Sequence, residues 1–171
     1  HALAYTLPLN CKTPALLTVH DIIALEYPSL CSLQNICHMK LLLPRSIKKA
    51  AKCAVPSTDV ANRMIRKLQT PAEKIEVIPW GVDFKRFNTK VTETEIVLPE
   101  KYFLFVGNLE PKKNLLFLLK AYAEFSENNN DYPLVIVGRA AWKCKALVKT
   151  IKTWCYAGKV IWLGRLSDDD L

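Results

Sequence analysis

The chain has 171 residues, 50% of them hydrophobic, and a formal net charge of +8. This composition excludes a disordered chain, and no apolar run approaches the roughly 18 residues that span a bilayer. The basic excess favours anionic partners such as phosphates, nucleic acids or acidic membrane surfaces without choosing among them.

The pattern of the first half predicts strands over 15–19, 53–55 and 75–79, with helical segments over 29–52 and after residue 57. Pro44 should break or restart the first helical segment, because proline removes a hydrogen-bond donor and clashes with the preceding turn. Ser57 is a suitable N-cap for the second segment. Val60, Met64 and Leu68 recur there every four residues and predict one apolar face.

The pattern fades over 80–100, which is polar and mixed, and we interpret this stretch as a domain junction. Beyond it, the sequence predicts strands over 102–106, 133–138 and 160–164 and helices over 114–126 and 141–156. Strands that are apolar throughout and alternate with helices indicate a parallel sheet covered on both faces. We therefore expect an α/β protein of two pieces, 1–92 and 93–171.

Glycines follow each predicted strand of the second piece, at positions 107, 138 and 164. The carboxyl ends of parallel strands meet at one edge of a sheet, where ligands bind. His20 and Gly81 lie at the equivalent edge of the first piece. The sequence therefore predicts a site in the cleft between the two pieces.

Lys112 and Lys113 stand just before a helix that Asn114 can cap. Lysine is unfavourable there for the helix alone, because the helix dipole already makes its N-terminus positive. An incoming anion would explain the pair, and Gly107 would let it approach the backbone; a solvated basic loop is the alternative. Neither the P-loop nor the dinucleotide-binding pattern of glycines is present.

Six cysteines, at positions 11, 31, 37, 53, 144 and 155, form no C-x-x-C pair. Their spacing matches no zinc motif, so we expect no metal site. We expect reduced, mostly buried thiols, Cys53 among them, and a cytoplasmic location.

Together, "YFLFVGNLEPKKNLLFLLKAY", "LVIVGRAAW" and "VIWLGRLSDDDL" resemble the donor-binding domain of family 4 glycosyltransferases (glycosyl transferases group 1). The stretch "TVHDIIALEYP" and the segment from "VPSTDV" to "VDFKRFN" resemble the end of their acceptor domain. The resemblance implies the GT-B fold, with two Rossmann-like parallel-sheet pieces, both incomplete here. Residues 1–92 would be the C-terminal part of the acceptor-side domain, and 93–171 the first half of the donor domain.

The resemblance also implies roles for the residues around the lysine pair. Lys113 matches the family lysine that binds the diphosphate of a nucleotide sugar, and Gly107 matches the glycine before it. Asn108 stands where the family often has an arginine, which leaves Lys112 or Arg139 as a substitute contact.

Further roles follow for the other strand ends. Gly164 and Arg165 match the loop that contacts the nucleotide base, and Gly81 lies where the acceptor domain closes the cleft. His20 matches the histidine that faces the transferred sugar, through its side chain or its backbone carbonyl, and Asp21 accompanies it. From the residues alone, His20 could merely end a strand, and Asp21 could orient His20 or cap the next segment.

The resemblance implies transfer of a sugar, with mannose the nearest match, from a GDP- or UDP-sugar to a polysaccharide or lipid-linked acceptor with retention. It implies no cofactor and no divalent metal. The chain begins without methionine, and the family's Glu-x7-Glu motif would fall beyond Leu171, so we expect an internal piece that is inactive alone. We expect the cytoplasm or the cytoplasmic face of a membrane. The alternatives are a nucleic-acid-binding module, although the basic residues are dispersed, and a catalytically dead GT-B-like binding protein.

Overall fold

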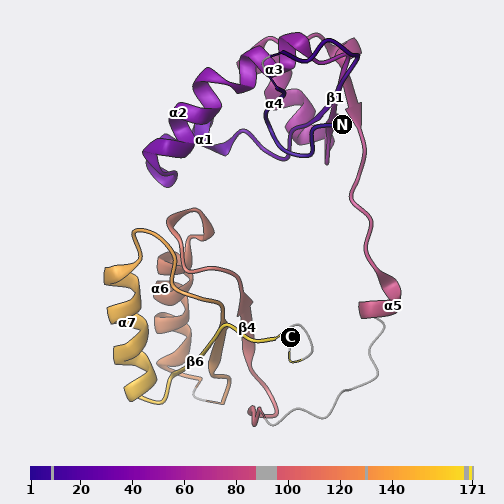
Figure 1. The fold of residues 1–171 in the computed structure, drawn as a ribbon. Coiled ribbons are helices and arrows are strands. Elements are labelled where there is room, and N and C mark those ends of the chain that lie inside the picture. Colours follow the sequence, from indigo (N-terminus) through magenta and orange to yellow (C-terminus); the bar gives the residue numbers. More distant parts are fainter. Residues whose placement is uncertain (9, 88–95, 130, 168–169, 171) are drawn as a thin grey trace. The chain divides into compact units, whose positions relative to one another are not determined.

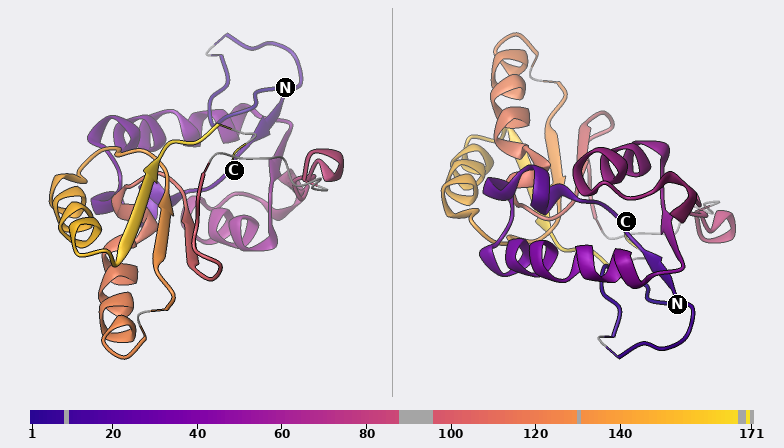
Figure 2. Two further views of the ribbon diagram at one scale, coloured as in Figure 1. Left: turned by 90° about the horizontal axis from the view of Figure 1, so that it is seen from below. Right: turned by 90° about the horizontal axis from the view of Figure 1, so that it is seen from above.

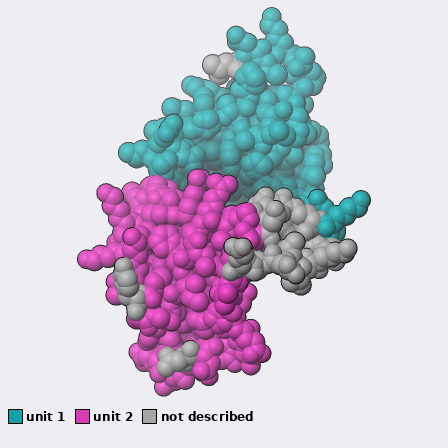
Figure 3. All heavy atoms as spheres, turned by 60° about the horizontal axis from the view of Figure 1, so that its bottom comes forward, with its two compact units in different colours: residues 1–87 teal, residues 88–171 magenta. Residues whose placement is uncertain are grey.

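The chain divides into two compact units, unit 1 (residues 1–87) and unit 2 (residues 88–171), which Figure 3 shows in different colours. The computed structural model describes residues 1–8, 10–87, 96–129, 131–167 and 170, without the side chains of residues 86, 87 and 156. The predicted junction between residues 92 and 93 lies outside the described residues.

Unit 1 is built on a three-stranded parallel sheet (Figure 1). Its strands lie in the order β1 (Leu16–Thr18), β2 (Lys52–Val55) and β3 (Ile75–Val77). In the register of the sheet, Leu17 pairs with Cys53, which pairs with Ile75. The three strands predicted for the first half are thus confirmed, with ends that differ by one or two residues.

The helices described in unit 1 are α1 (Ile23–Glu26), α2 (Leu33–Leu41), α3 (Leu43–Lys49), α4 (Thr58–Leu68) and α5 (Phe84–Phe87), with 3₁₀ turns η1 (Pro28–Leu30) and η2 (Ala72–Lys74). Pro44 stands in the first turn of α3, so the predicted restart is confirmed. The side chain of Ser57 accepts a hydrogen bond from the N–H of Val60 at 3.3 Å and caps α4 as predicted. The short helix α1 was not predicted, because four residues show no helical period.

The α2 and α3 helices follow one another along nearly the same line (Figures 1 and 2). Met39, Leu43 and Ile47 recur every four residues along them and are buried in one core with Leu17 and Cys53. Cys53 is buried as predicted, but the expectation of mostly buried thiols is wrong. Only Cys53 and Cys144 are buried, and Cys37 is exposed because it lies on the outward face of α2.

Unit 2 repeats the pattern with β4 (Phe103–Val106), β5 (Leu134–Val137) and β6 (Val160–Gly164), which pair in parallel in that order. Its helices are α6 (Leu115–Ser126) and α7 (Lys145–Tyr156), and the 3₁₀ turn η3 (Pro111–Lys113) precedes α6. Leu115, Leu119 and Tyr122 of α6 are buried, so one face of this helix packs into the core of unit 2. The α7 helix starts four residues later than predicted.

The strands of unit 2 differ in how far they are covered. All four residues of β5 are buried, as expected for a strand inside a parallel sheet. The expectation of cover on both faces is wrong for β4, where Leu104 and Val106 are 54% and 50% exposed. The reason is that α6 and α7 pack into the core on the face that carries Leu134 and Ile136, whereas Leu104 and Val106, in register with Val135 and Val137, lie on the opposite face. Among the described residues, every helix is too short or too polar to cross a lipid bilayer.

Candidate functional site

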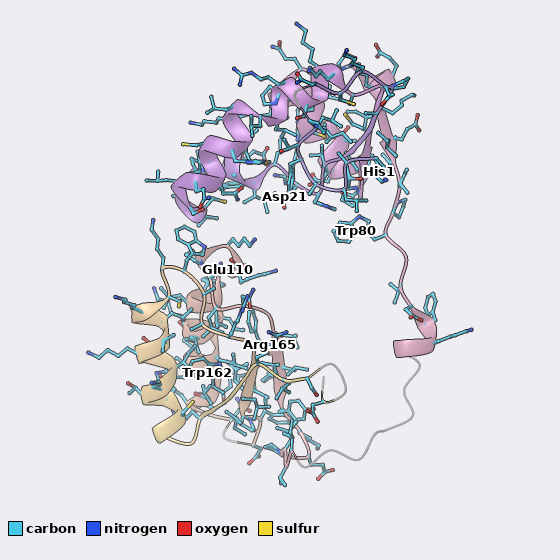
Figure 4. All side chains as sticks on the ribbon, viewed as in Figure 1. His1, Asp21, Trp80, Glu110, Trp162 and Arg165 are labelled. Atoms are coloured by element: carbon cyan, nitrogen blue, oxygen red, sulfur yellow. The ribbon has the colours of Figure 1, made fainter. Side chains whose placement is uncertain are left out.

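A pocket of about 520 Å³ lies at the carboxyl edge of the sheet in unit 2. The loops that follow β4, β5 and β6 line it, as expected for a parallel sheet. Four of the predicted donor-binding residues are among the lining residues: Gly107, Asn108, Lys113 and Arg165. Figure 4 shows Arg165 just past the end of β6 and Glu110 on the loop after β4.

Leu109 holds the loops after β4 and β5 together. Its side chain is fully buried. Its N–H donates to the carbonyl oxygen of Arg139 at 2.9 Å, and its own carbonyl accepts from the N–H of Ala141 at 3.2 Å. These two hydrogen bonds hold Asn108 and Glu110, the residues on either side of Leu109, beside Arg139 in the wall of the pocket.

Gly138 is required by a close approach of two backbones. Its φ is +143°, and a Cβ atom at this position would lie 2.0 Å from the carbonyl oxygen of Gly107. The N–H of Gly138 donates to the carbonyl oxygen of Gly164 at 2.6 Å, and its carbonyl accepts from the Trp162 indole at 2.9 Å. Gly138 therefore joins all three loops of the pocket. Gly164, which was predicted to bind the donor, accepts the hydrogen bond from Gly138 but is not among the lining residues.

The two lysines of the predicted pair differ in position. Lys113 lines the pocket, and its Cε lies 3.9 Å from where a Cβ on Gly107 would be. Lys112 is not among the lining residues; its Nζ lies 3.5 Å from Oε1 of Glu110. Asn114 occupies the N-cap position of α6 in a left-handed conformation, but its side chain makes no capping hydrogen bond. The predicted side-chain cap is therefore absent, because the preceding 3₁₀ turn sets a different backbone direction.

The charges of the pocket suit an anion with more than one negative charge. Lys113, Arg139 and Arg165 bring one cation from each of the three loops, and Glu110 adds one carboxylate. Glu110 was missed, although it stands in the quoted "EPKKN" between a strand end and the lysines. Its carboxylate interacts with Lys112, so Lys113 keeps its charge available to a ligand.

His20 of unit 1 is held by several contacts. Its Nε2 donates to the carbonyl oxygen of Leu3 at 2.8 Å, and its ring meets those of Tyr5 and Trp80 edge-on at 5.5 and 5.2 Å. Its Nδ1 is buried and has no hydrogen-bond partner among the described residues. The ring is thus fixed by packing and by one hydrogen bond, and its predicted role toward a sugar stays a prediction.

Asp21 is bound to its own loop. Its Oδ1 accepts from the N–H of Ile23 at 3.0 Å, at the start of α1, and its Oδ2 accepts from the hydroxyl of Tyr5 at 3.3 Å. Burial, and then the negative charge of Asp21, raises the pKa of Tyr5. Of the two readings left open for Asp21, these contacts match a cap on the next segment.

Replacing Asp21 by alanine is expected to lower the free energy of unfolding by about 1–3 kcal/mol, because a charge-assisted hydrogen bond to the Ile23 N–H is lost. Asp21→Asn keeps an oxygen acceptor for that N–H and should lose clearly less. Urea denaturation of both variants measures the difference. Equal losses in the two variants would contradict the capping role.

Gly81 belongs to unit 1, in the exposed segment that follows β3, and is not among the lining residues of the pocket in unit 2. A Cβ at Gly81 would meet nothing within 4 Å, so unit 1 by itself does not require a glycine there. Asp21 and Trp80 are labelled on unit 1 in Figure 4, and Trp80 is 66% exposed although its ring contacts His20. No group of three His, Cys, Asp or Glu side chains in the described part of the chain could hold a metal ion.

Two family models together match the whole chain. The model of Glycosyltransferase Family 4 matches residues 1–86, and that of Glycosyl transferases group 1 matches residues 87–171. The chain belongs to glycosyltransferase family 4. The two matched ranges meet where the structure divides into its two units.

Relatives of this family 4 chain include three bacterial transferases. An O-antigen chain mannosyltransferase B of Escherichia coli is 26% identical over 92% of the chain and 43% of its own length. The O-antigen chain mannosyltransferase RfbU of Salmonella typhimurium is 27% identical over 91% of the chain and 41% of its own length. A diphospho-undecaprenol 4-alpha-N-acetylgalactosaminyltransferase of Campylobacter jejuni is 28% identical over 91% of the chain and 38% of its own length. The chain thus spans about two fifths of the length of these relatives.

Solved structures of Anabaena HepE share the fold. The complex with UDP and glucose aligns with a TM-score of 0.59 at 22% identity, over 91% of this chain and 42% of HepE. The complex with UDP aligns with a TM-score of 0.57 at 19% identity, over 91% and 43%. The two units are therefore Rossmann-like pieces of the GT-B type, as the sequence predicts.

Proposed function

We propose that the pocket of unit 2 binds the diphosphate of a nucleotide sugar and that the whole protein transfers the sugar. The observation that carries this proposal is the convergence of Lys113, Arg139 and Arg165 from three strand ends in a glycosyltransferase family chain. Loss of a nucleoside diphosphate builds negative charge on the leaving oxygens. Fixed cations in a shaped pocket stabilise that charge.

The proposed residue roles follow from this geometry. Lys113 contacts the diphosphate, and Arg165 lies toward the nucleoside. Arg139 supplies the second cation, because Asn108 stands where the family often has an arginine. In the same proposal, His20 acts at the transferred sugar through its backbone carbonyl, because its Nε2 is bonded to the carbonyl oxygen of Leu3 and its Nδ1 is buried.

The acceptor is proposed from the relatives. Two are named O-antigen chain mannosyltransferases, and a third is named for a diphospho-undecaprenol acceptor. We therefore propose a polysaccharide or lipid-linked acceptor, transfer with retention and a site of action at the cytoplasmic face of a membrane.

Titration calorimetry with UDP and GDP tests the diphosphate site directly on this chain. One of the two nucleotides is expected to bind at a single site, and free pyrophosphate should displace it, because the pocket charges act on the phosphates. Absence of binding by both nucleotides and by pyrophosphate would overturn the proposal.

Turnover by the whole protein is expected to survive EDTA, because cationic side chains replace a metal at the leaving diphosphate. The measurement is the rate of sugar transfer from a GDP- or UDP-sugar before and after addition of the chelator. Loss of activity that Mg²⁺ or Mn²⁺ restores would contradict metal-independent transfer.

A further inference from the structure

Unit 1 contains a long segment without negative charge. Residues 27–58 include five Lys or Arg residues and no Asp or Glu. Lys52 is paired, with its Nζ 2.7 Å from Oε1 of Glu76. Lys40, Arg45 and Lys48 are exposed, and in the described part of the chain none of them forms an ion pair.

These cations share an outward face with exposed leucines. The buried stripe of α2 and α3 is Met39, Leu43 and Ile47, so the residues on the opposite side of these helices face solvent. Leu33 and Leu41, eight residues apart on α2, are 80% and 58% exposed. We call Leu33, Lys40, Leu41, Arg45 and Lys48 the α2–α3 patch.

The dipole of α3 favours Lys48, which lies in its last turn, but it does not account for Arg45, which lies in its first turn. Positive side chains near a helix C-terminus commonly satisfy its last carbonyl groups. Here Lys74, from outside the helix, does so: its Nζ donates to the carbonyl oxygens of Ile47, Lys48 and Ala50 at 3.3, 3.1 and 3.0 Å. The end of α3 is thus satisfied without the side chains of Arg45 and Lys48.

A second pocket, of about 490 Å³, lies beside the patch. Leu7 and Leu42 are among its lining residues, and Arg45 and Lys48 line it as well. An apolar hollow beside cations suits a ligand with a negative headgroup and a hydrocarbon part. A nucleic acid or an acidic protein would use the cations but would leave the exposed leucines without a function.

We propose that the α2–α3 patch binds the surface of a lipid bilayer that carries anionic headgroups. Lys40, Arg45 and Lys48 lie against the headgroup phosphates, and Leu33 and Leu41 enter the boundary between headgroups and acyl chains. Basic side chains are attracted to such a surface, and exposed apolar side chains beside them add binding when they are buried at the interface. The patch would bring the chain to a lipid-linked acceptor, and in that respect the inference rests on the proposed function.

Sedimentation with vesicles tests the proposal on the full chain. The chain is expected to sediment with vesicles of equal parts phosphatidylglycerol and phosphatidylcholine and to remain in solution with phosphatidylcholine alone. The variant Arg45→Glu/Lys48→Glu should lower partition onto the anionic vesicles by at least roughly thirtyfold, since each lost cation contributes about fivefold and the two glutamates are repelled as well. The variant Leu33→Asn/Leu41→Asn should lower it by at least about tenfold.

Each variant has a matched control elsewhere on the chain. Arg66→Glu/Lys67→Glu makes the same charge change on exposed residues of α4, and Leu116→Asn/Phe117→Asn removes exposed apolar side chains from α6. Both controls should keep most of the vesicle binding. Equal losses in the controls, or no binding of the parent chain to anionic vesicles, would overturn the proposal, and the second outcome would favour an acidic protein or nucleic acid as partner.

Vesicle binding needs no nucleotide, so the two proposals fail separately. Calorimetry with UDP and GDP should give the same affinity for Arg45→Glu/Lys48→Glu as for the parent chain, because neither residue lines the pocket of unit 2. A chain that binds vesicles but no nucleotide would contradict the proposed donor site in unit 2 and would support membrane binding by the α2–α3 patch.

Discussion

Replacing Lys113 by alanine is expected to weaken binding of the preferred nucleoside diphosphate by roughly tenfold to a hundredfold. Lys113 lines the pocket beside Gly107, and the substitution removes the charged hydrogen-bond donor that we propose for the phosphates. The effect should appear in titration calorimetry as a higher Kd with one binding site retained. In the whole protein, the same change should lower kcat/KM by a similar or larger factor, because negative charge grows as the diphosphate leaves.

Lys112→Ala is the matched control, since it removes the same side chain one position earlier. Lys112 is not among the lining residues of the pocket and interacts with Glu110. Its removal leaves the Glu110 carboxylate without this partner and should weaken nucleotide binding by only about threefold. An unchanged affinity for Lys113→Ala, or an equal loss for Lys112→Ala, would remove the assignment of Lys113 to the diphosphate.

Gly138→Ala is expected to lower the free energy of unfolding of unit 2 by at least about 4 kcal/mol. The new Cβ would lie 2.0 Å from the carbonyl oxygen of Gly107, and no flexible side chain can yield there. The backbone is also tied down: Gly107 donates to the carbonyl oxygen of Val137, and Gly138 to that of Gly164. Urea denaturation followed by tryptophan fluorescence measures the loss.

Gly158→Ala separates this clash from backbone strain. Gly158 also has a positive φ, +70°, but a Cβ there would meet nothing within 4 Å. Its substitution should cost only about 1–2 kcal/mol. Similar losses for the two variants would show that the approach of Gly107 to Gly138 is not tight. If Gly138→Ala does not fold at all, circular dichroism of Gly158→Ala still measures the strain term by itself.

Local patterns were sufficient for the elements of the fold and for part of the site. Apolar runs predicted all six described strands, because a strand in a parallel sheet must be apolar wherever both of its faces are covered. Pro44 and Ser57 marked helix starts, since a missing N–H and a capping hydroxyl act within one turn. Gly107 could be placed at the pocket because it follows a strand of a parallel sheet, whereas Lys113 and Arg165 were placed there by the resemblance to family 4 glycosyltransferases.

Other features depend on residues that are distant in sequence. Glu110 and Arg139 face one pocket because Leu109 bonds to the loop after β5, and no periodicity encodes that bond. The hydrogen bond of the Asp21 carboxylate to the Tyr5 hydroxyl likewise joins residues distant in sequence, and the predicted role of Asp21 beside His20 stays a prediction.

The sequence by itself determined the order and type of the elements, their parallel pairing within two α/β pieces, and the membership in a glycosyltransferase family. The tertiary structure alone decided that Lys112 interacts with Glu110 and is not among the lining residues of the pocket, and that Gly138 must be a glycine. The reason is physical: periodicity and capping act over a few residues along the chain. The meeting of loops is decided by sheet register and by hydrogen bonds between backbones that are far apart in sequence.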